Sequence, residues 1–291
     1  MQLTERDCAI IRLVHRHRFL RSPQIVSLVG DSRQQILRRL QLLYHHGYLE
    51  RPRAQIDYYH QGGAHHIVHG LGNKGAAILK RKFGIPFHRL ERSKKNQSVG
   101  RIFLEHALLV ADVMVAIELA CRESGHIRLV TGEELKLPGK LGARRQPFRW
   151  KVKVSNRVKI GVIPDRVFAL DVQGPDDTSN RLFFFLEADR GTMPITRRDL
   201  AQTSFYRKLL AYEATWSQSL HRTFFGFNRF RVLTVTTNPK RVESLVSACS
   251  RLKRGHGLFL FADQIVLAKP GSLFSAIWHT GKPGETGSML R

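Results

Sequence analysis

Two apolar segments joined by a short polar link constrain the fold of this chain more than any other feature of its sequence. Residues 158–170 and 181–189 both have the composition of β-strands, and residues 183–185 of the second are all phenylalanine. A continuous apolar strand is covered on both faces, so we expect these phenylalanines to be core residues. Because the link of residues 171–180 is short, the two strands are predicted to be neighbours in one sheet.

Three acidic residues lie in these strands. Asp165 follows Pro164 in the first, and Glu187 and Asp189 end the second. Alternate strand residues point to one face of a sheet, so Glu187 and Asp189 are expected to project together. If Asp165 faces them, the carboxylates repel one another unless protons or a cation neutralise them, which predicts Mg²⁺ bound by Asp165 and Glu187. Strand-end acids that face solvent or pair with arginines are the alternative.

The charge of the chain indicates a polyanionic partner. Its 291 residues include 48 Lys and Arg against 23 Asp and Glu, which gives a net charge of +25 and a pI of 10.9. We expect the partner to be double-stranded DNA. The first third has the densest positive charge, since residues 1–95 hold 18 Lys and Arg but only six Asp and Glu.

The cysteines and the hydropathy pattern bear on the compartment. Cys8, Cys121 and Cys249 are far apart and odd in number, so they predict neither a disulfide framework nor a zinc motif. The N-terminus lacks an apolar core of the signal-peptide type, and no stretch approaches the ~20 apolar residues of a spanning helix. We therefore expect a cytoplasmic protein with no membrane partner.

Three short helices in the N-terminal third predict a helix-turn-helix. They begin at Thr4, at Ser22 and near Ser32. In the third helix, Ile36, Leu37, Leu40 and Leu43 are predicted to face inward, and the outward face has no acid. Glutamine and arginine read base edges through paired hydrogen bonds, so we predict a recognition helix, with a solvated polar face as the alternative. The predicted DNA contacts are Arg33, Gln34, Arg38, Gln41 and His45.

A hairpin, or wing, is expected after this helix, with strands at residues 48–51 and 56–60 and Arg53 at a turn. Arg51 and Arg53 are predicted to contact phosphates, and so are His60, His65 and His66. A metal site is the alternative for these histidines, but no ligand spacing here matches a zinc motif. The string from Gly70 to Gly75 matches a dinucleotide-binding fingerprint, but no second parallel strand follows it. Asn73 as a helix cap explains its glycines more simply.

After a polar, basic linker, the rest of the chain alternates helices and strands. Arg144 and Arg145 lie in a basic loop with Phe148 and Trp150, a mixture that grips phosphates and stacks on bases, or else forms a solvated rim. Tyr206 and Trp216 are predicted to be core. The predicted elements are a helix at 101–123, a strand at 127–130, the basic loop at 136–153, the two acid-bearing strands, a helix at 196–217 opened by a capping box from Thr196 to Asp199, a strand at 230–236, a helix at 239–252 and a strand at 258–261.

Four short motifs follow one another in the second part of the chain. They are Pro164-Asp165, Glu187-Ala188-Asp189-Arg190-Gly191-Thr192, Tyr206-Arg207-Lys208-Leu209-Leu210-Ala211-Tyr212 and Val232-Leu233-Thr234-Val235-Thr236-Thr237. Their order resembles the PD-(D/E)XK nuclease-like fold and, over roughly residues 4–279, is similar to the plasmid replication-relaxation family.

This resemblance implies an α+β protein with an N-terminal winged helix-turn-helix followed by an α/β restriction-endonuclease-like domain. The implied divisions are a winged helix at residues 1–88, a linker at 89–100, a nuclease-like domain at 101–279 and a flexible tail at 280–291. It also implies a DNA-binding protein of plasmid or mobile-element replication or DNA relaxation.

The chain departs from the nuclease signature at Asp189, which stands where that signature has lysine. The resemblance implies that Lys208 replaces this lysine, with Tyr212 one turn later on the same helix face. In an active site, Asp165 and Glu187 would hold Mg²⁺, Asp189 would add charge or orient water, and Lys208 would stabilise the transition state. The implied accessory residues are Arg190, Glu105 and His106.

Three functions stay open on the sequence alone. The first is a non-catalytic or weakly catalytic protein that binds duplex DNA. The second is a Mg²⁺-dependent endonuclease or nickase. The third is a non-enzymatic adaptor that recruits a relaxase or a replication initiator.

Overall fold

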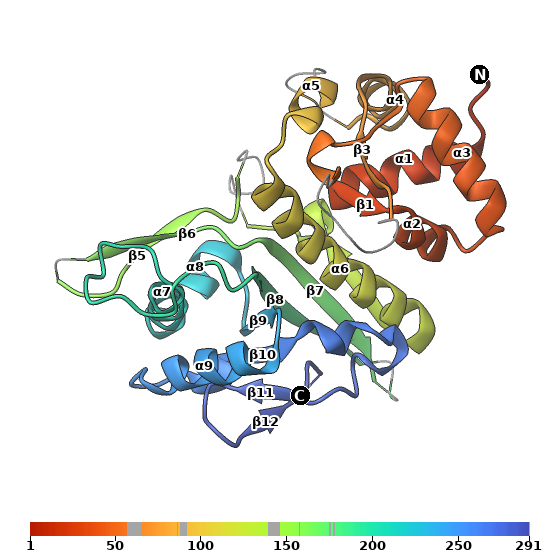
Figure 1. Cartoon of the computed structure of the whole chain (residues 1–291). Coiled ribbons are helices and arrows are strands. Elements are labelled where there is room, and N and C mark those ends of the chain that lie inside the picture. Colours follow the sequence, from red (N-terminus) through yellow and green to blue (C-terminus); the bar gives the residue numbers. More distant parts are fainter. Residues whose placement is uncertain are drawn as a thin grey trace. The chain divides into compact units, whose positions relative to one another are not determined.

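The computed structural model describes residues 1–56, 66–85, 87, 92–138, 146–156, 158–174, 176 and 178–290. It shows a mixed α+β chain (Figure 1), as expected from the sequence. Residue contacts divide the chain into two compact units, Met1–Val115 and Ala116–Arg291. The division falls within the long helix α6 (Arg101–Ser124).

The first unit packs helices around a small antiparallel sheet with the strand order β1-β3-β2. Apolar side chains from three helices meet in its core, where Ile10, Ile25 and Ile36 are fully buried. The elements are α1 (Glu5–His17), β1 (Phe19–Arg21), α2 (Ser22–Val29), α3 (Arg33–His45), β2 (Leu49–Glu50), β3 (Val68–Leu71), α4 (Asn73–Phe83) and α5 (Arg92–Gln97).

Local signals define the first two helices. Thr4 and Asp7 form a reciprocal capping box at the start of α1, the helix predicted to begin at Thr4. Gly30 ends α2 in the left-handed conformation, with φ 73°. The pairing of the strands differs from the prediction, because β3 is the partner of β2. Ile56 lies outside any strand, and residues 57–60 lie outside the described residues.

Two glycines let the start of α4 approach the turn before β2. A Cβ on Gly72 would lie 2.4 Å from the Gly47 carbonyl oxygen, and one on Gly75 would lie 2.3 Å from that of Tyr48. Asn73 is not the cap residue of α4, because Gly72 occupies that position. Close backbone packing therefore explains the glycines that the sequence presents as a fingerprint.

The predicted linker at residues 89–100 contains the ordered helix α5. Asn96 is buried and donates to the Leu71 carbonyl oxygen at 2.8 Å, and the Ser93 N–H donates to Asn73 Oδ1 at 2.9 Å. These contacts place α5 in the first unit. Residues 89–91 lie outside the described residues.

The start of α6 also belongs to the first unit, although residue 101 was the predicted start of the second domain. Asp112 accepts hydrogen bonds from Arg21 and from Gln24, the latter at 2.8 Å. Leu104 and Leu108 pack in one cluster with Phe19. The polar contacts and the apolar cluster both tie this part of the helix to β1 and α2.

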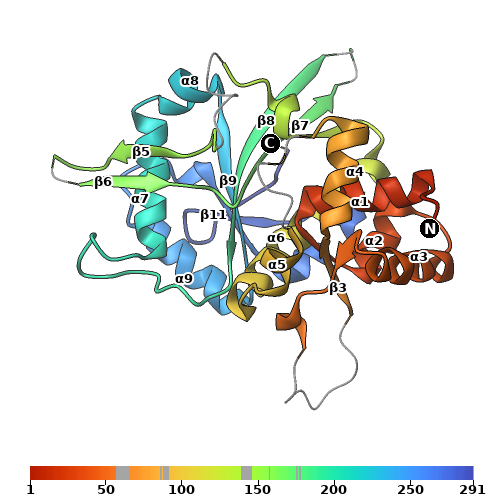
Figure 2. The same ribbon diagram turned by 90° about the horizontal axis from the view of Figure 1, so that it is seen from above.

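A seven-stranded sheet forms the centre of the second unit, and Figure 2 shows it from above. Its strand order is β12-β11-β10-β9-β8-β7-β4. Most neighbours are antiparallel, whereas β8, β9 and β10 run parallel to one another. The strands are β4 (Ile127–Thr131), β7 (Arg166–Gln173), β8 (Ser179–Asp189), β9 (Phe230–Thr236), β10 (Phe259–Asp263), β11 (Trp278–Thr280) and β12 (Thr286–Gly287).

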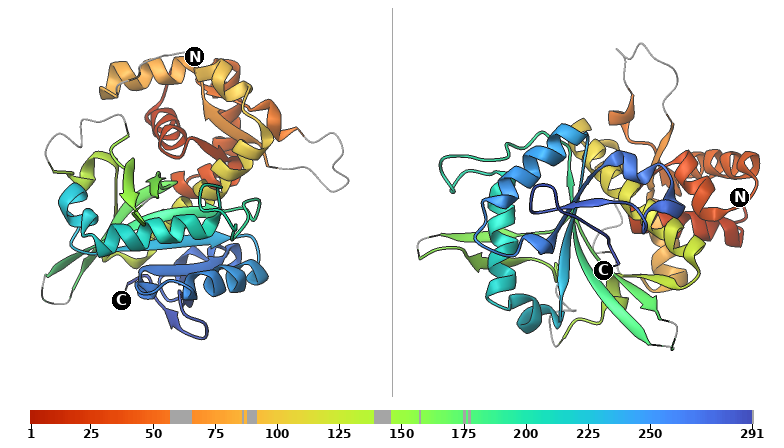
Figure 3. Two further views of the ribbon diagram at one scale, coloured as in Figure 1. Left: turned by 90° about the vertical axis from the view of Figure 1, so that its left-hand side faces the viewer. Right: turned by 90° about the horizontal axis from the view of Figure 1, so that it is seen from below.

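One face of this sheet is covered by helices and by a separate two-stranded sheet. The helices are α7 (Phe205–Ser217), α8 (Leu220–Phe225) and α9 (Pro239–Ser250), and the strands are β5 (Trp150–Lys153) and β6 (Lys159–Val162). Both α7 and α9 lie along this face (Figures 2 and 3) and contribute to its main apolar cluster. Phe185, Val232 and Phe259 form part of the sheet side of that cluster.

The predicted strand at residues 158–170 is two strands in different sheets. β6 pairs with β5, whereas β7 pairs with β8. The break includes Pro164, which has no N–H to donate to a ladder. The predicted adjacency of the two acid-bearing strands is confirmed by the antiparallel β7–β8 pair.

Two further segments of the second unit differ from the prediction. The helix predicted from Thr196 begins at Phe205, with Ser204 as its cap, while Asp199 accepts from the Ala201 N–H in a local turn. The predicted flexible tail forms β12, which pairs with β11, and Met289 is fully buried.

Cys8, Cys121 and Cys249 are all buried and none forms a disulfide. Within the described part of the chain, no helix has both the length and the apolar character needed to cross a bilayer.

Candidate functional site

Glu187 lies near the end of β8, with its side chain only 1% exposed. Its Oε2 accepts a hydrogen bond from Lys208 Nζ at 2.5 Å, and its Oε1 accepts one from the Tyr212 hydroxyl at 2.5 Å. Lys208 and Tyr212 are four residues apart on α7, so they share one helix face. The predicted shared helix face of Lys208 and Tyr212 is therefore present in the structure, and both side chains contact Glu187.

Asp165 reaches the same strand from the turn before β7. Its backbone N–H donates to the Leu186 carbonyl oxygen at 3.0 Å, and its Oδ2 accepts from the Ala188 N–H at 2.8 Å. These two bonds bracket Glu187 on β8. Asp165, in the turn before β7, and Glu187, on β8, thus lie close together.

Asp189 has a different partner. Arg241 donates to both of its carboxylate oxygens, at 2.7 and 3.1 Å, and Thr236 Oγ1 donates to it at 3.0 Å. The guanidinium also donates to the Met193 carbonyl oxygen at 2.6 Å. A bidentate pair of this kind is among the stronger charged contacts in proteins.

Arg241 belongs to this cluster although it was not predicted to be a site residue. Arg241 lies in the first turn of α9, just after β9. β8 and β9 are parallel and pair Asp189 with Thr236, so both strands end at the same edge of the sheet. The strand order and register were the missing information, since the Asn238-Pro239 start of the helix is visible in the sequence.

Burial dominates the electrostatics of this cluster. It raises the pKa of Glu187, against the lowering effect of the Lys208 charge. Burial alone would lower the pKa of Lys208, but Glu187, Asp165 and Asp189 outweigh it and raise that pKa. Burial and the adjacent Glu187 also raise the pKa of Tyr212 well above its usual value. A lysine and a hydroxyl donating to one carboxylate favour an ionised Glu187 paired with a charged Lys208.

These carboxylates do not fit a Mg²⁺ site as they lie. No group of three or more His, Cys, Asp or Glu side chains in the described part of the chain is placed to hold a metal ion. Both Glu187 oxygens accept from protein donors, and Asp189 is neutralised by Arg241. As they lie, Glu187 and Asp189 are thus paired with Lys208 and Arg241 and are not arranged around a site for Mg²⁺.

The accessory residues fall in two places. Glu105 and His106 lie on the part of α6 that belongs to the first unit, where Glu105 Oε1 accepts from Arg101 Nε at 2.7 Å. Arg190 directly follows β8 and is half-buried.

The predicted DNA-reading face of α3 is exposed. Ile36, Leu40 and Leu43 are buried, as predicted, but Leu37 is 39% exposed and lies on the outward side. Its exposure places a branched apolar side chain beside the polar ones. The exposed residues predicted to contact DNA are Arg33, Gln34, Arg38, Gln41 and His45.

The wing residues are placed only in part. Arg51 is half-buried, with its guanidinium carbon 4.1 Å from the centre of the Tyr44 ring. Arg53 is exposed in a single 3₁₀ turn (Arg53–Gln55), and His66 is exposed after it. His60 and His65 lie outside the described residues.

The aromatic residues of the basic loop pack against the core of the second unit. Trp150 is buried in β5 and donates from Nε1 to Thr215 Oγ1 at 2.9 Å, and the half-buried Phe148 packs against Phe225. The predicted base stacking is therefore wrong for Trp150, because its ring belongs to the core under α7. Trp216, predicted to be core, is 37% exposed instead. Arg144 and Arg145 lie outside the described residues.

Comparison with known proteins gives one match. The family model described as replication-relaxation matches residues 11–227. The chain belongs to the replication-relaxation family. The match covers α3 of the first unit and the β7–β8 acids with Lys208 and Tyr212 of the second. Family membership indicates a role in the replication or relaxation of a plasmid or mobile element. No curated protein and no solved structure matches the chain.

Proposed function

We propose that this protein binds duplex DNA through its first unit, folded as a winged helix, during the replication or relaxation of a plasmid or mobile element. The observation that most supports the proposal is the exposed face of α3, where arginine, glutamine and histidine side chains occur without an acid. Paired donors of this kind match base edges in the major groove, and the exposed Leu37 suits a thymine methyl group.

The elements around α3 support the same assignment. α2 and α3 follow each other with a tight turn at Gly30, and strands β2 and β3 come after them. In a helix-turn-helix the second helix enters the major groove while neighbouring basic residues contact phosphates. Arg53, exposed beyond β2, is suited to a phosphate contact.

The test is duplex binding by the full-length chain as a function of salt. Fluorescence anisotropy with a labelled fragment of the plasmid should give tight binding that weakens steeply with salt. The log–log slope should be about −0.9 per phosphate neutralised, so about six contacts cost roughly 10³-fold between about 50 and 200 mM salt. Binding with no salt dependence would overturn the proposal.

A second candidate function is phosphodiester cleavage by the second unit, which we propose to have a PD-(D/E)XK nuclease-like fold. One observation favours it: Asp165, Glu187 and Lys208 lie together at the end of β8. The closed contacts of Glu187 and Asp189 argue against it. Nicking of supercoiled plasmid decides between the two functions. The adaptor alternative gains no specific support from the described residues.

A further inference from the structure

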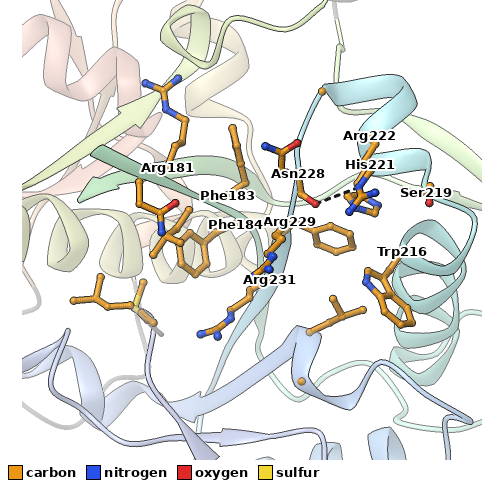
Figure 4. A pocket seen from close by; sticks show the side chains of 18 of the residues that line it. Arg181, Phe183, Phe184, Trp216, Ser219, His221, Arg222, Asn228, Arg229 and Arg231 are labelled. Atoms are coloured by element: carbon orange, nitrogen blue, oxygen red, sulfur yellow. Dashed lines mark hydrogen bonds between the residues drawn. The ribbon is translucent and has the colours of Figure 1, made fainter. Parts of the chain in front are cut away.

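The second unit contains a large pocket on the sheet, away from the Glu187 contacts. Its volume is about 1110 Å³, and its lining residues come mainly from β8, the end of α7, α8 and β9. Figure 4 shows Phe183 and Phe184 on one side, Trp216 and His221 on the other, and Arg229 and Arg231 between them. Pockets for small ligands have about 300–1,000 Å³, so this one lies just above the upper end of that range.

The lining is strongly basic. Five arginines contribute to it, and none of the residues described as lining it is acidic. Two of the arginines are neutralised from outside the lining, Arg181 by Asp171 and Arg254 by Glu213. The other three are Arg222, Arg229 and Arg231.

These three arginines have no acidic partner among the described residues. Arg222 donates weakly to the Asn228 carbonyl oxygen at 3.4 Å, and Arg231 donates to the Ser288 carbonyl oxygen. Arg229 is exposed and has no hydrogen bond or ion pair with the described residues. Burial lowers the pKa of Arg231, so an anion that offsets its charge would be favourable there.

The other lining residues indicate that the ligand is a nucleic-acid strand and not a single inorganic anion. The Trp216 ring is 37% exposed beside the arginines, where a planar base can stack on it. Ser219 and Asn228 add short polar groups that can bond to base edges. A base offers its face to a protein ring when it is unpaired and not stacked within a duplex, which favours single-stranded over double-stranded nucleic acid as the ligand.

We propose that this pocket binds a short unpaired stretch of nucleic acid, with phosphates on Arg222, Arg229 and Arg231 and a base on Trp216. The site is separate from the duplex-binding surface proposed for the first unit and does not depend on it. A protein that handles opened DNA during replication or relaxation would have a use for both.

The test uses the fluorescence of Trp216 in the full-length chain. Of the three tryptophans, Trp150 and Trp278 are buried, so quenching by a short oligothymidylate should report mainly on Trp216. We expect saturable quenching that is lost in Trp216→Phe. Quenching that persists in this variant would overturn the proposal.

A matched pair of charge variants tests the arginines. Arg229→Gln should weaken oligothymidylate binding roughly tenfold, because a charged hydrogen bond to phosphate is lost. Arg251→Gln makes the same charge change at an exposed arginine that does not line the pocket, and should stay within about twofold of wild type. Equal effects of the two substitutions would overturn the proposal.

Competition identifies the ligand. Unlabelled oligothymidylate should reverse the quenching, whereas inorganic phosphate at equal phosphate concentration should not. Phosphate that competes equally well would reduce the site to a single-anion pocket, and competition by duplex alone would exclude an unpaired strand. Arg38→Ala in the first unit should leave the quenching unchanged, so the result stands whether or not the duplex-binding proposal holds.

Discussion

Glu187 is a buried carboxylate whose two oxygens are both used inside the protein. Lys208 and Tyr212 each donate to it at 2.5 Å, and Asp165 lies nearby in the turn before β7. An ion pair of this kind is costly to bury, and losing one partner leaves a charge without compensation. The cluster should therefore stabilise the β8–α7 contact as a unit, whatever its role in chemistry.

Lys208→Met tests that dependence at the level of a single residue. The substitution keeps the stem of the side chain but leaves Glu187 unpaired, so the free energy of unfolding should fall by about 3–5 kcal/mol in urea titrations. Tyr212→Phe removes one neutral donor and should cost about 1–3 kcal/mol. Adding Glu187→Gln to Lys208→Met should recover part of the loss. A Lys208→Met loss below about 1 kcal/mol would contradict this account.

His69 makes the stability of the first unit depend on pH. It is buried in β3, and burial together with the Arg51 charge lowers its pKa from 6.5 to about 3. Below about pH 6.5 this histidine binds a proton in the unfolded chain but stays neutral in the folded chain until the pH approaches 3. The folding stability that is present above pH 6.5 is therefore lost as the pH falls towards 3. The loss should be about 1.4 kcal/mol per pH unit in this window.

Urea unfolding at about pH 7 and pH 5 measures the effect. His69→Gln should remove the roughly 2 kcal/mol difference that this histidine produces between the two pH values. His66→Gln is the matched control, because His66 is exposed three residues earlier. An identical pH dependence in the two variants would show that His69 is not responsible.

At the level of elements, local patterns predicted more than long-range pairings did. The start of α1 at Thr4 and the shared helix face of Lys208 and Tyr212 depend on residues within one helix, and both predictions are confirmed. Strand pairing is decided by distant segments, so the sequence did not predict that β6 pairs in a separate sheet or that Arg241 contacts Asp189.

Errors at the element ends have similar causes. The capping-box pattern from Thr196 to Asp199 does not start a helix, because the Asp199 side chain satisfies the Ala201 N–H in a turn. Leu37 fits the apolar helical period, yet its side chain is 39% exposed. The exposure of such a residue depends on how much of its helix face the neighbouring elements cover, and the periodicity of the sequence does not report this.

Two arginines should separate base reading from phosphate binding in the first unit. Arg38→Ala on α3 should reduce the preference for the bound plasmid sequence by about 1–3 kcal/mol while changing affinity for unrelated duplex much less. Arg53→Ala, beyond β2, should weaken binding to all duplexes and reduce the salt slope by about 1. Competition anisotropy with specific and unrelated fragments measures both effects. Equal losses on both fragments for Arg38→Ala would remove α3 from sequence reading.

At the scale of the whole molecule, ion pairs with acids neutralise some of the basic side chains and leave others without an acidic partner. Asp171, Glu187 and Asp189 are each held by internal Arg or Lys side chains. The outward face of α3 and the lining of the basic pocket contain no acid. Each unit thus has a basic surface without acids, and these are the two surfaces at which we propose that nucleic acid binds.

The contacts of the acids in the second unit predict the outcome of a cleavage assay on the full-length chain. With Mg²⁺ or Mn²⁺ present, we expect supercoiled plasmid to remain uncut, because Glu187 and Asp189 have no free oxygen facing a metal ion. Asp165→Asn keeps an oxygen for the Ala188 N–H, so it should bind duplex as wild type does and serve as the matched control. Gel analysis of nicked and supercoiled forms is the measurement. Nicking by wild type that disappears in Asp165→Asn, with binding intact, would instead establish the second unit as a nuclease and require the Lys208 and Arg241 contacts to open.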